Sequence, residues 1–229
     1  MASNGEASDT AREYLETIYN ISMEGDRVVG AQLAEKFGVS PPSVTGMLHR
    51  LERDGYLIVD RKRGAMLTPH GVEVAELSLR RHRLAERFLV DVLGMDWIAA
   101  HEEAQALQIG MTPRLEAHML AVLDNPTTCP HGNPIPGSEL DGREFLRSRH
   151  AVRLSDVNQG QAVRVVCVSE VVEDEGALIR EVGHLGLHPG RELRVSRQGP
   201  SGTTIDLDGE QTAVVKSLAD KIWVAADSS

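Results

Sequence analysis

The stretch Ala31–Thr68, AQLAEKFGVSPPSVTGMLHRLERDGYLIVDRKRGAMLT, contains the pattern from which the rest of the architecture can be inferred. A first helix ends at Gly38, where glycine suits a left-handed cap. Ser40 is an N-cap candidate, and Pro41 follows at the first helical position, where its missing N–H costs nothing. A helix, a tight glycine-containing turn and a second helix form the pattern of a helix-turn-helix motif.

A predicted β-hairpin follows this motif and extends it to a winged helix-turn-helix. The runs Tyr56–Val59 and Ala65–Thr68 read as two short strands, and the loop Asp60–Gly64 joins them. Although the chain has a net charge of −10, cationic side chains gather on the second helix and the loop, where DNA phosphates would lie. They belong to Arg50, Arg53, Arg61, Lys62 and Arg63.

Small residues begin the second helix of the motif, at the end that enters the major groove in such proteins. They are Ser40, Pro42, Ser43 and Thr45. Any helix carries some arginines, but their coincidence with the turn and the hairpin favours double-stranded DNA as the partner. Because none of these short side chains reads a base strongly, we expect much of the specificity to come from DNA shape and from dimer spacing.

Length and composition restrict the remaining possibilities. The 229 residues allow one or two domains, or three small ones, and the net charge of −10 argues against nonspecific coating of nucleic acid or membrane. No apolar run reaches the length of a membrane span, and the opening residues, MASNGEASDT, are unlike a signal peptide. The two cysteines suggest no disulfide framework. We therefore predict a cytoplasmic protein with no membrane partner.

Predicted helices flank the winged motif on both sides. Thr10–Ser22 is amphipathic and precedes it, whereas Pro69 begins a long helix that ends at Gly94. Trp97–Ile109 and Leu115–Leu123 are predicted as two further helices. The apolar side chains of the later helices exceed what one small domain needs and indicate a homodimer interface. These residues are Leu84, Phe88, Leu89, Val92, Leu115, Met119 and Val122.

A candidate metal cluster lies in the stretch Leu79–Ile109, LRRHRLAERFLVDVLGMDWIAAHEEAQALQI. His82 and Glu86 are four residues apart, which places both side chains on one helix face, and His101 can reach the same place from the next helix. Imidazole nitrogens and carboxylate oxygens suit a divalent transition metal. The alternative is a solvated ion pair beside an unrelated histidine.

The chain changes character after the turn DNPTTCPHGNPIPG. In this turn Cys129 and His131 resemble metal ligands, but two ligands without a partner pair are weak grounds for a metal. A charged linker is expected at Ser138–His150, and beyond it short strands predict a small, partly open β-barrel. Glu170 and Glu173 lie at the end of its first strand, where surface carboxylates are the default interpretation. The predicted strands are Val163–Val168, Glu192–Ser196, Thr204–Leu207, Ala213–Val215 and Ile222–Ala225.

These stretches together resemble the iron- and manganese-dependent repressors typified by the diphtheria toxin repressor family. The matching motifs are EYLETIY, LAEKFGVSPPSVTGMLHRLERDGYL, LTPHG, RRHRLAERFLVDVLG and NPTTCPHGNPIPG. The carboxy-terminal LGLHPGRELRV is similar to the SH3-like module of the small ferrous-transport accessory protein FeoA. The resemblance covers nearly the whole chain, which makes it more specific than any single motif.

The resemblance implies a metal site, called here the ancillary site, shared by the helices and the SH3-like module. Its ligands fall on His82, Glu86, His101, Glu170 and Glu173. The resemblance also implies an anion-binding position beside this site, on Arg83, Cys129 and Asn133. Cys129 stands where the family usually has serine. We therefore expect an intact ancillary site that holds Fe²⁺ or Mn²⁺, with Co²⁺, Ni²⁺ or Zn²⁺ as substitutes in vitro.

The primary, activating metal site of the family is altered in this chain. Its positions fall on Glu13, Gln105, Gln108 and Ile109, with Glu16 as an additional carboxylate. Isoleucine cannot coordinate a metal, and amide oxygens are weak neutral ligands. Either only the ancillary site works, or a weaker oxygen-rich site survives, or metal control has been abandoned. We favour the first interpretation.

The predicted architecture is mainly α-helical with a small β part. We expect a winged helix-turn-helix DNA-binding domain at residues 1–72, a helical metal-binding and dimerisation domain at 73–140, a linker at 141–150 and an SH3-like domain at 151–229. The resemblance implies a homodimeric, metal-responsive transcriptional repressor of metal-homeostasis genes, with operator DNA as partner and no small organic substrate.

Two kinds of alternative remain open. One is a regulator of the same fold that is independent of metal or senses another ligand, which the altered primary site favours. The other is a metalloenzyme or a metal carrier that uses the histidine cluster. An enzyme is disfavoured because the candidate ligands could close the metal's shell, and no HExxH motif or paired catalytic carboxylates occur. A winged helix with a basic tip has no purpose in an enzyme or a carrier.

Overall fold

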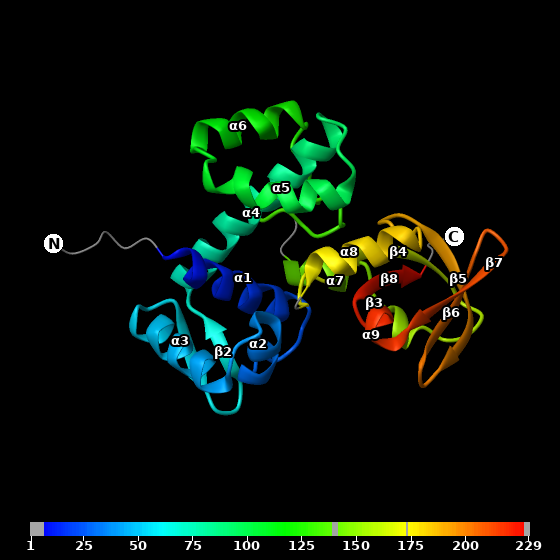
Figure 1. The fold of residues 1–229 in the computed structure, drawn as a ribbon, viewed down its shortest axis with the longest axis horizontal. Coiled ribbons are helices and arrows are strands. Elements are labelled where there is room, and N and C mark those ends of the chain that lie inside the picture. The colour runs from blue at the N-terminus through cyan, green and yellow to red at the C-terminus, as the bar shows by residue number, and fades with distance from the viewer. Residues whose placement is uncertain (1–6, 139–141, 173, 227–229) are drawn as a thin grey trace.

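A long helix connects the winged helix to the rest of the fold (Figure 1). The computed structural model describes residues 7–138, 142–172 and 174–226. A helical unit follows the winged helix along the chain, and a carboxy-terminal module built on a β-sheet lies to one side of both. Helix α4 (Pro69–Asp91) runs from the winged helix into the helical unit, and Thr68 caps its first turn as the sequence predicts.

The winged helix forms as predicted. Its elements are α1 (Asp9–Met23), α2 (Gly30–Phe37), α3 (Pro41–Arg53), β1 (Leu57–Asp60) and β2 (Gly64–Leu67). Gly38 closes α2 with φ of 60°, a left-handed cap that carries no penalty for glycine. Ser40 caps α3 by accepting a hydrogen bond from the Ser43 N–H. Leu15 and Leu33 are fully buried in the core that these helices share.

A close backbone approach holds the wing, the hairpin formed by β1 and β2, against the rest of the motif. At Gly64, φ is 84°, and a Cβ atom there would lie 2.0 Å from the Val28 carbonyl oxygen. At the tip, the Asp60 carboxylate accepts hydrogen bonds from the backbone N–H groups of Arg63 and Lys62, which lower its pKa. The exposed cationic side chains of the tip therefore extend from an ordered turn.

The helical unit consists of α4, α5 (Trp97–Ile109) and α6 (Pro113–Val122), and its packing corrects the expected dimer surface. Three of the apolar residues assigned to that surface are instead buried within the single chain: Leu84, Leu89 and Met119. Three others remain exposed, at 45%, 41% and 63%: Val92, Leu115 and Val122. A smaller apolar surface than expected is therefore left for a partner.

An antiparallel sheet forms the frame of the carboxy-terminal module, and every strand predicted for it is present. Its elements are β3 (Val152–Arg153), a 3-10 turn (Leu154–Asp156), β4 (Ala162–Val168), α8 (Glu175–His184), β5 (Glu192–Gly199), β6 (Gly202–Leu207), β7 (Glu210–Val215), α9 (Lys216–Ala219) and β8 (Ile222–Ala226). The strands pair in the order β3-β8-β4-β5-β6-β7. The sequence pattern does not predict α8, although Asp174 caps it and Leu178 and Val182 bury one side of it.

The segment between the helical unit and the module is folded rather than extended. Where a charged linker was expected, α7 (Gly142–Ser148) forms. Its Phe145 is 2% exposed and packs against Cys167 and Trp223 of the module. Within the described part of the chain, no helix combines the length and the apolar character needed to cross a lipid bilayer.

Candidate metal centre and nucleic-acid interface

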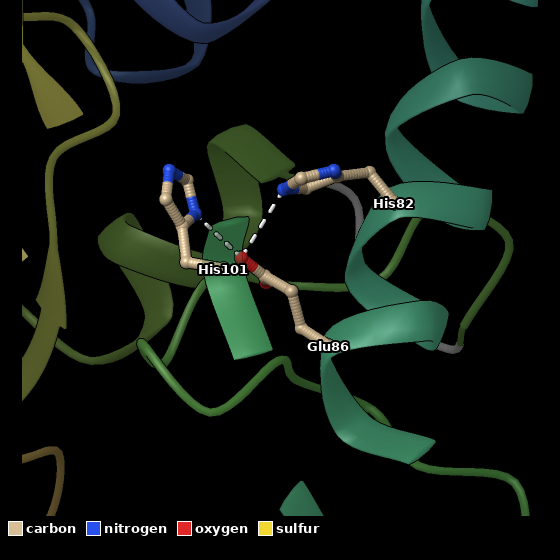
Figure 2. Close-up of side chains that lie close together, drawn as sticks. All are labelled: His82, Glu86 and His101. Carbon is tan, nitrogen blue, oxygen red and sulfur yellow. Dashed lines mark hydrogen bonds and ion pairs between the residues drawn. The ribbon is translucent and has the colours of Figure 1, made fainter. Parts of the chain in front are cut away.

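The ligands predicted on the two central helices converge on one carboxylate oxygen, as Figure 2 shows. Helix α4 carries His82 and Glu86 one turn apart, and α5 brings His101 against them. His82 Nε2 lies 3.1 Å from Glu86 Oε1, and His101 Nδ1 lies 2.9 Å from the same oxygen. The residues are 8%, 1% and 8% exposed, respectively. A solvated ion pair does not describe this group, because water hardly reaches it.

A third imidazole, from the turn after the helical unit, completes the cluster. His131 Nδ1 lies 3.3 Å from Glu86 Oε1, and Cys129 Sγ lies 3.9 Å from His131 Nδ1. Two overlapping groups with metal-ligand spacing result, namely His82–Glu86–His101 and Glu86–Cys129–His131. The sequence pattern shows no further ligand beside Cys129 and His131, and the structure places Glu86 of α4 next to them.

Burial disfavours the charged forms of the titratable side chains in this cluster. The neighbouring groups of opposite charge have the larger effect on their pKa values. The Glu86 carboxylate raises the pKa of His82 to about 9 and the pKa of His131 well above its usual value. In turn, the imidazoles of His131 and His82 hold the pKa of Glu86 well below its usual value. Glu86 is therefore a buried carboxylate whose charged form is stabilised by His131 and His82.

The chemistry of the cluster fits a divalent transition metal. Among the described residues, Glu86 Oε2 and His82 Nδ1 are buried and have no hydrogen-bond partner. A buried polar atom in that state costs about 1–3 kcal/mol. Imidazole nitrogens and carboxylate oxygens are the ligands that such metals take, and the free Glu86 oxygen is available to one.

Glu170 of the module lies beside the cluster and is held by residues that were predicted to bind an anion. Arg83 Nη2 donates to Glu170 Oε2 at 2.7 Å, and the Asn133 side chain donates to Oε1 at 2.9 Å. The Asn20 side chain of α1 also donates to Oε2, at 2.9 Å. Burial alone would raise the pKa of Glu170, but the Arg83 guanidinium outweighs it and lowers that pKa. Glu170 belongs to neither ligand group, and Cys129 directs its sulfur to the cluster.

Another carboxylate of the module approaches the cluster, although Glu173, the predicted ligand, lies outside the described residues. Glu175 begins α8, and its Oε2 lies 3.6 Å from His101 Nε2. Its Oε1 lies 2.8 Å from Nζ of Lys36 on α2, and Lys36 also donates to the Glu170 carbonyl oxygen at 3.2 Å. The sequence pattern predicts neither Glu175 nor Lys36 as part of the site, because nothing in their spacing shows that α2 and α8 meet.

The residues of the altered primary site lie around a cavity of about 380 Å³, and three of them also line a smaller cavity with His82. Glu13, Glu16, Gln105 and Gln108 line the larger cavity. The Gln108 side chain donates to Gln105 Oε1 at 3.1 Å, and burial raises the pKa of Glu16. Neither glutamate belongs to a metal-ligand group in the described part of the chain. The structure thus brings the four residues together with oxygen donors only.

The residues predicted to contact DNA are all exposed on α3, at its N-cap and on the wing. They are Ser40, Pro42, Ser43, Thr45, Arg50, Arg53, Arg61, Lys62 and Arg63. The Nε atoms of Arg50 and Arg53 lie 3.7 Å and 3.4 Å from carboxylate oxygens of Asp54. Such exposed ion pairs contribute little to the stability of the fold. Their guanidinium groups therefore remain available to phosphates.

Replacement of the cationic wing residues Arg61, Lys62 and Arg63 by alanine is expected to weaken binding to all DNA sequences alike. Each phosphate contact that is lost should lower the slope of log affinity against log salt by about 0.9. Fluorescence anisotropy over a salt series measures this slope. The matched control is alanine at Arg194 and Arg197, exposed on the module, and an unchanged slope in the wing variant would argue against a phosphate contact there.

A winged helix, a helical unit with a buried cluster of metal-ligating residues and an SH3-like sheet together define a metal-dependent DNA-binding regulator. Residues 6–65 match the family described as "Iron dependent repressor, N-terminal DNA binding domain". Residues 68–137 match "Iron dependent repressor, metal binding and dimerisation domain", and residues 152–226 match "FeoA domain". The chain belongs to this family of iron-dependent repressors, which are transcriptional regulators rather than enzymes.

Relatives and solved structures agree with this assignment. The chain is 36% identical over 215 residues to "Iron-dependent repressor IdeR" of Mycobacterium tuberculosis, which covers 92% of this chain and 94% of that protein. It is 33% identical over 222 residues to "Diphtheria toxin repressor" of Corynebacterium diphtheriae, with coverage of 94% and 96%. The structure of the manganese regulator SloR matches with a TM-score of 0.77 and 28% identity, covering 99% of this chain and all of that one. The structure of a manganese-dependent transcriptional repressor in complex with manganese matches with a TM-score of 0.76 and 28% identity, covering 94% of this chain and 99% of that one.

Proposed function

We propose that this protein is a homodimeric cytoplasmic repressor of metal-homeostasis genes that binds operator DNA more tightly when its buried histidine cluster holds a divalent metal ion. The position of the cluster carries this proposal, because module residues at its border also contact the winged helix. His82, Glu86 and His101 would hold the ion, which supplies a fixed double positive charge beside the buried carboxylates.

Polar contacts tie the module to the winged helix and give the cluster a route to the DNA-binding surface. The contacting pairs are Asn20–Glu170, Lys36–Glu175, Asp26–Arg153 and Glu24–Ser169. Because Glu170 and Glu175 also border the cluster, the net charge of the cluster acts on the contacts that the module makes with α1 and α2. A bound ion shifts the equilibrium between two arrangements of the module and the winged helix only if its affinity differs between them. Glu170 and Glu175, at the border of the cluster, can provide this difference in affinity.

Fe²⁺ or Mn²⁺ is the ion that we propose for the cell. Imidazole and carboxylate ligands accept both, and the same donors would bind Co²⁺, Ni²⁺ or Zn²⁺ in vitro. The names of the relatives point in both directions, since they include an iron-dependent repressor and a manganese regulator. The side chains of Glu13, Glu16 and Gln105 themselves offer only oxygen donors to a metal. The histidine cluster is therefore the site to which we assign control of DNA binding.

Dimerisation is expected through the exposed apolar side chains of the helical unit. Leu115→Glu combined with Val122→Glu, on one side of α6, should give a monomer by light scattering. Operator affinity should fall about 100-fold or more, because two linked reading heads become independent. Val152→Glu is the matched control, since Val152 is 44% exposed on the module. A double variant that stays dimeric would place the interface elsewhere.

Operator binding by metal-free protein, with and without added Fe²⁺ or Mn²⁺, tests the proposed function. Duplexes selected from a random library, once with Mn²⁺ and once with chelator, supply the operator. Metal should tighten binding by about 5- to 150-fold, and chelator should reverse the gain. An affinity that chelator leaves unchanged would favour the metal-independent regulator, an alternative supported by Gln105 and Gln108 at the altered primary site.

A further inference from the structure

We propose that Arg153 of the module is a positioning residue for the wing and acts through the turn Glu24–Val29, which joins α1 to α2. This role rests on the proposed function only in that the wing contacts DNA, and it requires no metal ion. Arg153 lies on β3, at one edge of the module's sheet and far from the wing in sequence. The module contacts the turn, and the turn in turn contacts the wing.

Ion pairs and hydrogen bonds hold the Arg153 guanidinium between the module and the turn. Its Nη2 lies 2.6 Å from Asp26 Oδ2 and 3.5 Å from Glu24 Oε2. Its Nη1 donates to the Asp220 carbonyl oxygen at 3.0 Å, and its central carbon lies 5.1 Å from the centroid of the Trp223 ring. Because a guanidinium is planar and rigid, these module contacts fix the direction in which it presents its N–H donors to the turn.

The Glu24 carboxylate receives a second donor from the module. Glu24 is the C-cap of α1, and its Oε1 accepts a hydrogen bond from the Ser169 hydroxyl at 2.5 Å. The Glu24 and Arg153 side chains are 10% and 22% exposed, whereas that of Asp26 lies further out, at 47%. Salt screens a partly buried pair much less than a surface pair. The module therefore holds the start of the turn mainly through the shielded Glu24 carboxylate and steers it through Asp26.

The rest of the turn is bonded to the wing. The Arg27 side chain donates to the Arg61 carbonyl oxygen at the wing tip, at 2.7 Å. The Val28 carbonyl oxygen accepts a hydrogen bond from the Ala65 N–H of β2 at 3.2 Å, and Val28 is 3% exposed. Arg27 and Val28 directly follow the residues that the module holds. The contacts of the module therefore fix both the tip and one strand of the wing.

Removal of the Arg153 charge should leave the module docked on the winged helix. Val171 of the module packs against the hydrophobic core of the winged helix, and Lys221 Nζ donates to the Val171 carbonyl oxygen at 2.8 Å. Without Arg153 the turn has more conformations available, and the wing must lose that freedom when it binds DNA. Arg153 therefore raises DNA affinity by preorganising the wing.

Operator binding by the full-length Arg153→Gln protein in the presence of chelator tests this role. We expect the affinity to fall about 5-fold or more, and the slope of log affinity against log salt to fall with it. Arg153→Lys keeps the charge and should bind more tightly than Arg153→Gln. Arg191→Gln is the matched control, because Arg191 lies 2.6 Å from Asp208 within the module, and it should leave the affinity unchanged. Fluorescence anisotropy over a salt series measures these affinities.

A double-mutant cycle shows whether Arg153 acts through the wing. When Arg61, Lys62 and Arg63 are already alanine, the wing has lost its phosphate contacts, and Arg153→Gln should weaken binding no further. An equal loss in both backgrounds would exclude action through the wing, and an unchanged affinity of Arg153→Gln would exclude the role altogether. If thermal unfolding shows that Arg153→Gln is not folded, Asp26→Asn, which breaks the same ion pair, replaces it with the same expectation.

The metal response separates this inference from the proposed function. Arg153→Gln should weaken operator binding by about the same factor with Mn²⁺ and with chelator. A loss seen only with Mn²⁺ would place Arg153 on the metal-dependent route and overturn a metal-independent role. A wild-type protein that does not respond to metal would defeat the proposed function, whereas the effect of Arg153→Gln on DNA affinity would still support positioning of the wing.

Discussion

His82→Ala combined with His101→Ala is expected to abolish the effect of metal on operator affinity. Both imidazoles are buried and contact Glu86 Oε1, so their removal takes away two of the three ligands to which we assign the ion. The wild-type protein should bind operator about 5- to 150-fold more tightly with Mn²⁺ than without it, whereas the ratio in the double variant should fall to about 1. Fluorescence anisotropy on the selected operator measures both ratios.

Two exposed histidines provide the matched control for this experiment. His118 lies on α6 and His184 on α8, and both are at the surface. His118→Ala combined with His184→Ala makes the same chemical change outside the cluster and should keep the full metal response. If the variant at His82 and His101 still responded to metal, the cluster would not be the switch.

Arg83→Met is expected to lower the free energy of unfolding by about 3–5 kcal/mol, because it leaves a buried carboxylate without its cation. The Arg83 and Glu170 side chains are 4% and 14% exposed, and their atoms approach to 2.7 Å. Arg83 also donates to the Pro134 carbonyl oxygen at 2.6 Å. Urea unfolding followed by circular dichroism measures the loss. Addition of Glu170→Gln removes the unpaired charge and should restore most of the stability.

An exposed ion pair between the helical unit and the module is the control for Arg83. Arg180 of α8 lies 3.1 Å from Glu102 of α5, with side chains 44% and 61% exposed. Arg180→Met should therefore cost only about 0–1 kcal/mol. Equal losses in the two arginine variants would contradict a special role for the buried pair. So would a failure of Glu170→Gln to restore stability to Arg83→Met.

The helical half of the fold can be predicted from the sequence because its signals are local. Ser40 and Thr68 each cap a helix whose first residue is proline, and Gly38 takes the left-handed conformation expected of it. Helix α8 carries the same kind of signal, since Asp174 caps its ten residues. It escapes prediction because it interrupts a run of strands, where the alternating pattern on both sides dominates. The sequence also does not predict that Leu84 is buried within its own chain, because an apolar pattern does not show whether a side chain packs in the core or against a partner.

The candidate site can be predicted only where its ligands are close in sequence or carried by a family resemblance. A four-residue spacing locates His82 and Glu86, and the adjacent helix supplies His101. His131 reaches Glu86 only because its turn packs on β4, a contact that no spacing rule contains. The resemblance implies Glu170 as a metal ligand, whereas the structure pairs its carboxylate with Arg83.

The affinity of the protein for Mn²⁺, with and without bound operator, tests metal control of DNA binding most directly. Coupling between two binding sites is reciprocal, so the factor by which Mn²⁺ tightens operator binding must also be the factor by which operator tightens Mn²⁺ binding. Isothermal titration of Mn²⁺ into free protein and into the operator complex measures this factor. We predict that the complex binds Mn²⁺ about 5- to 150-fold more tightly. Equal affinities for the free and the DNA-bound protein would contradict metal control.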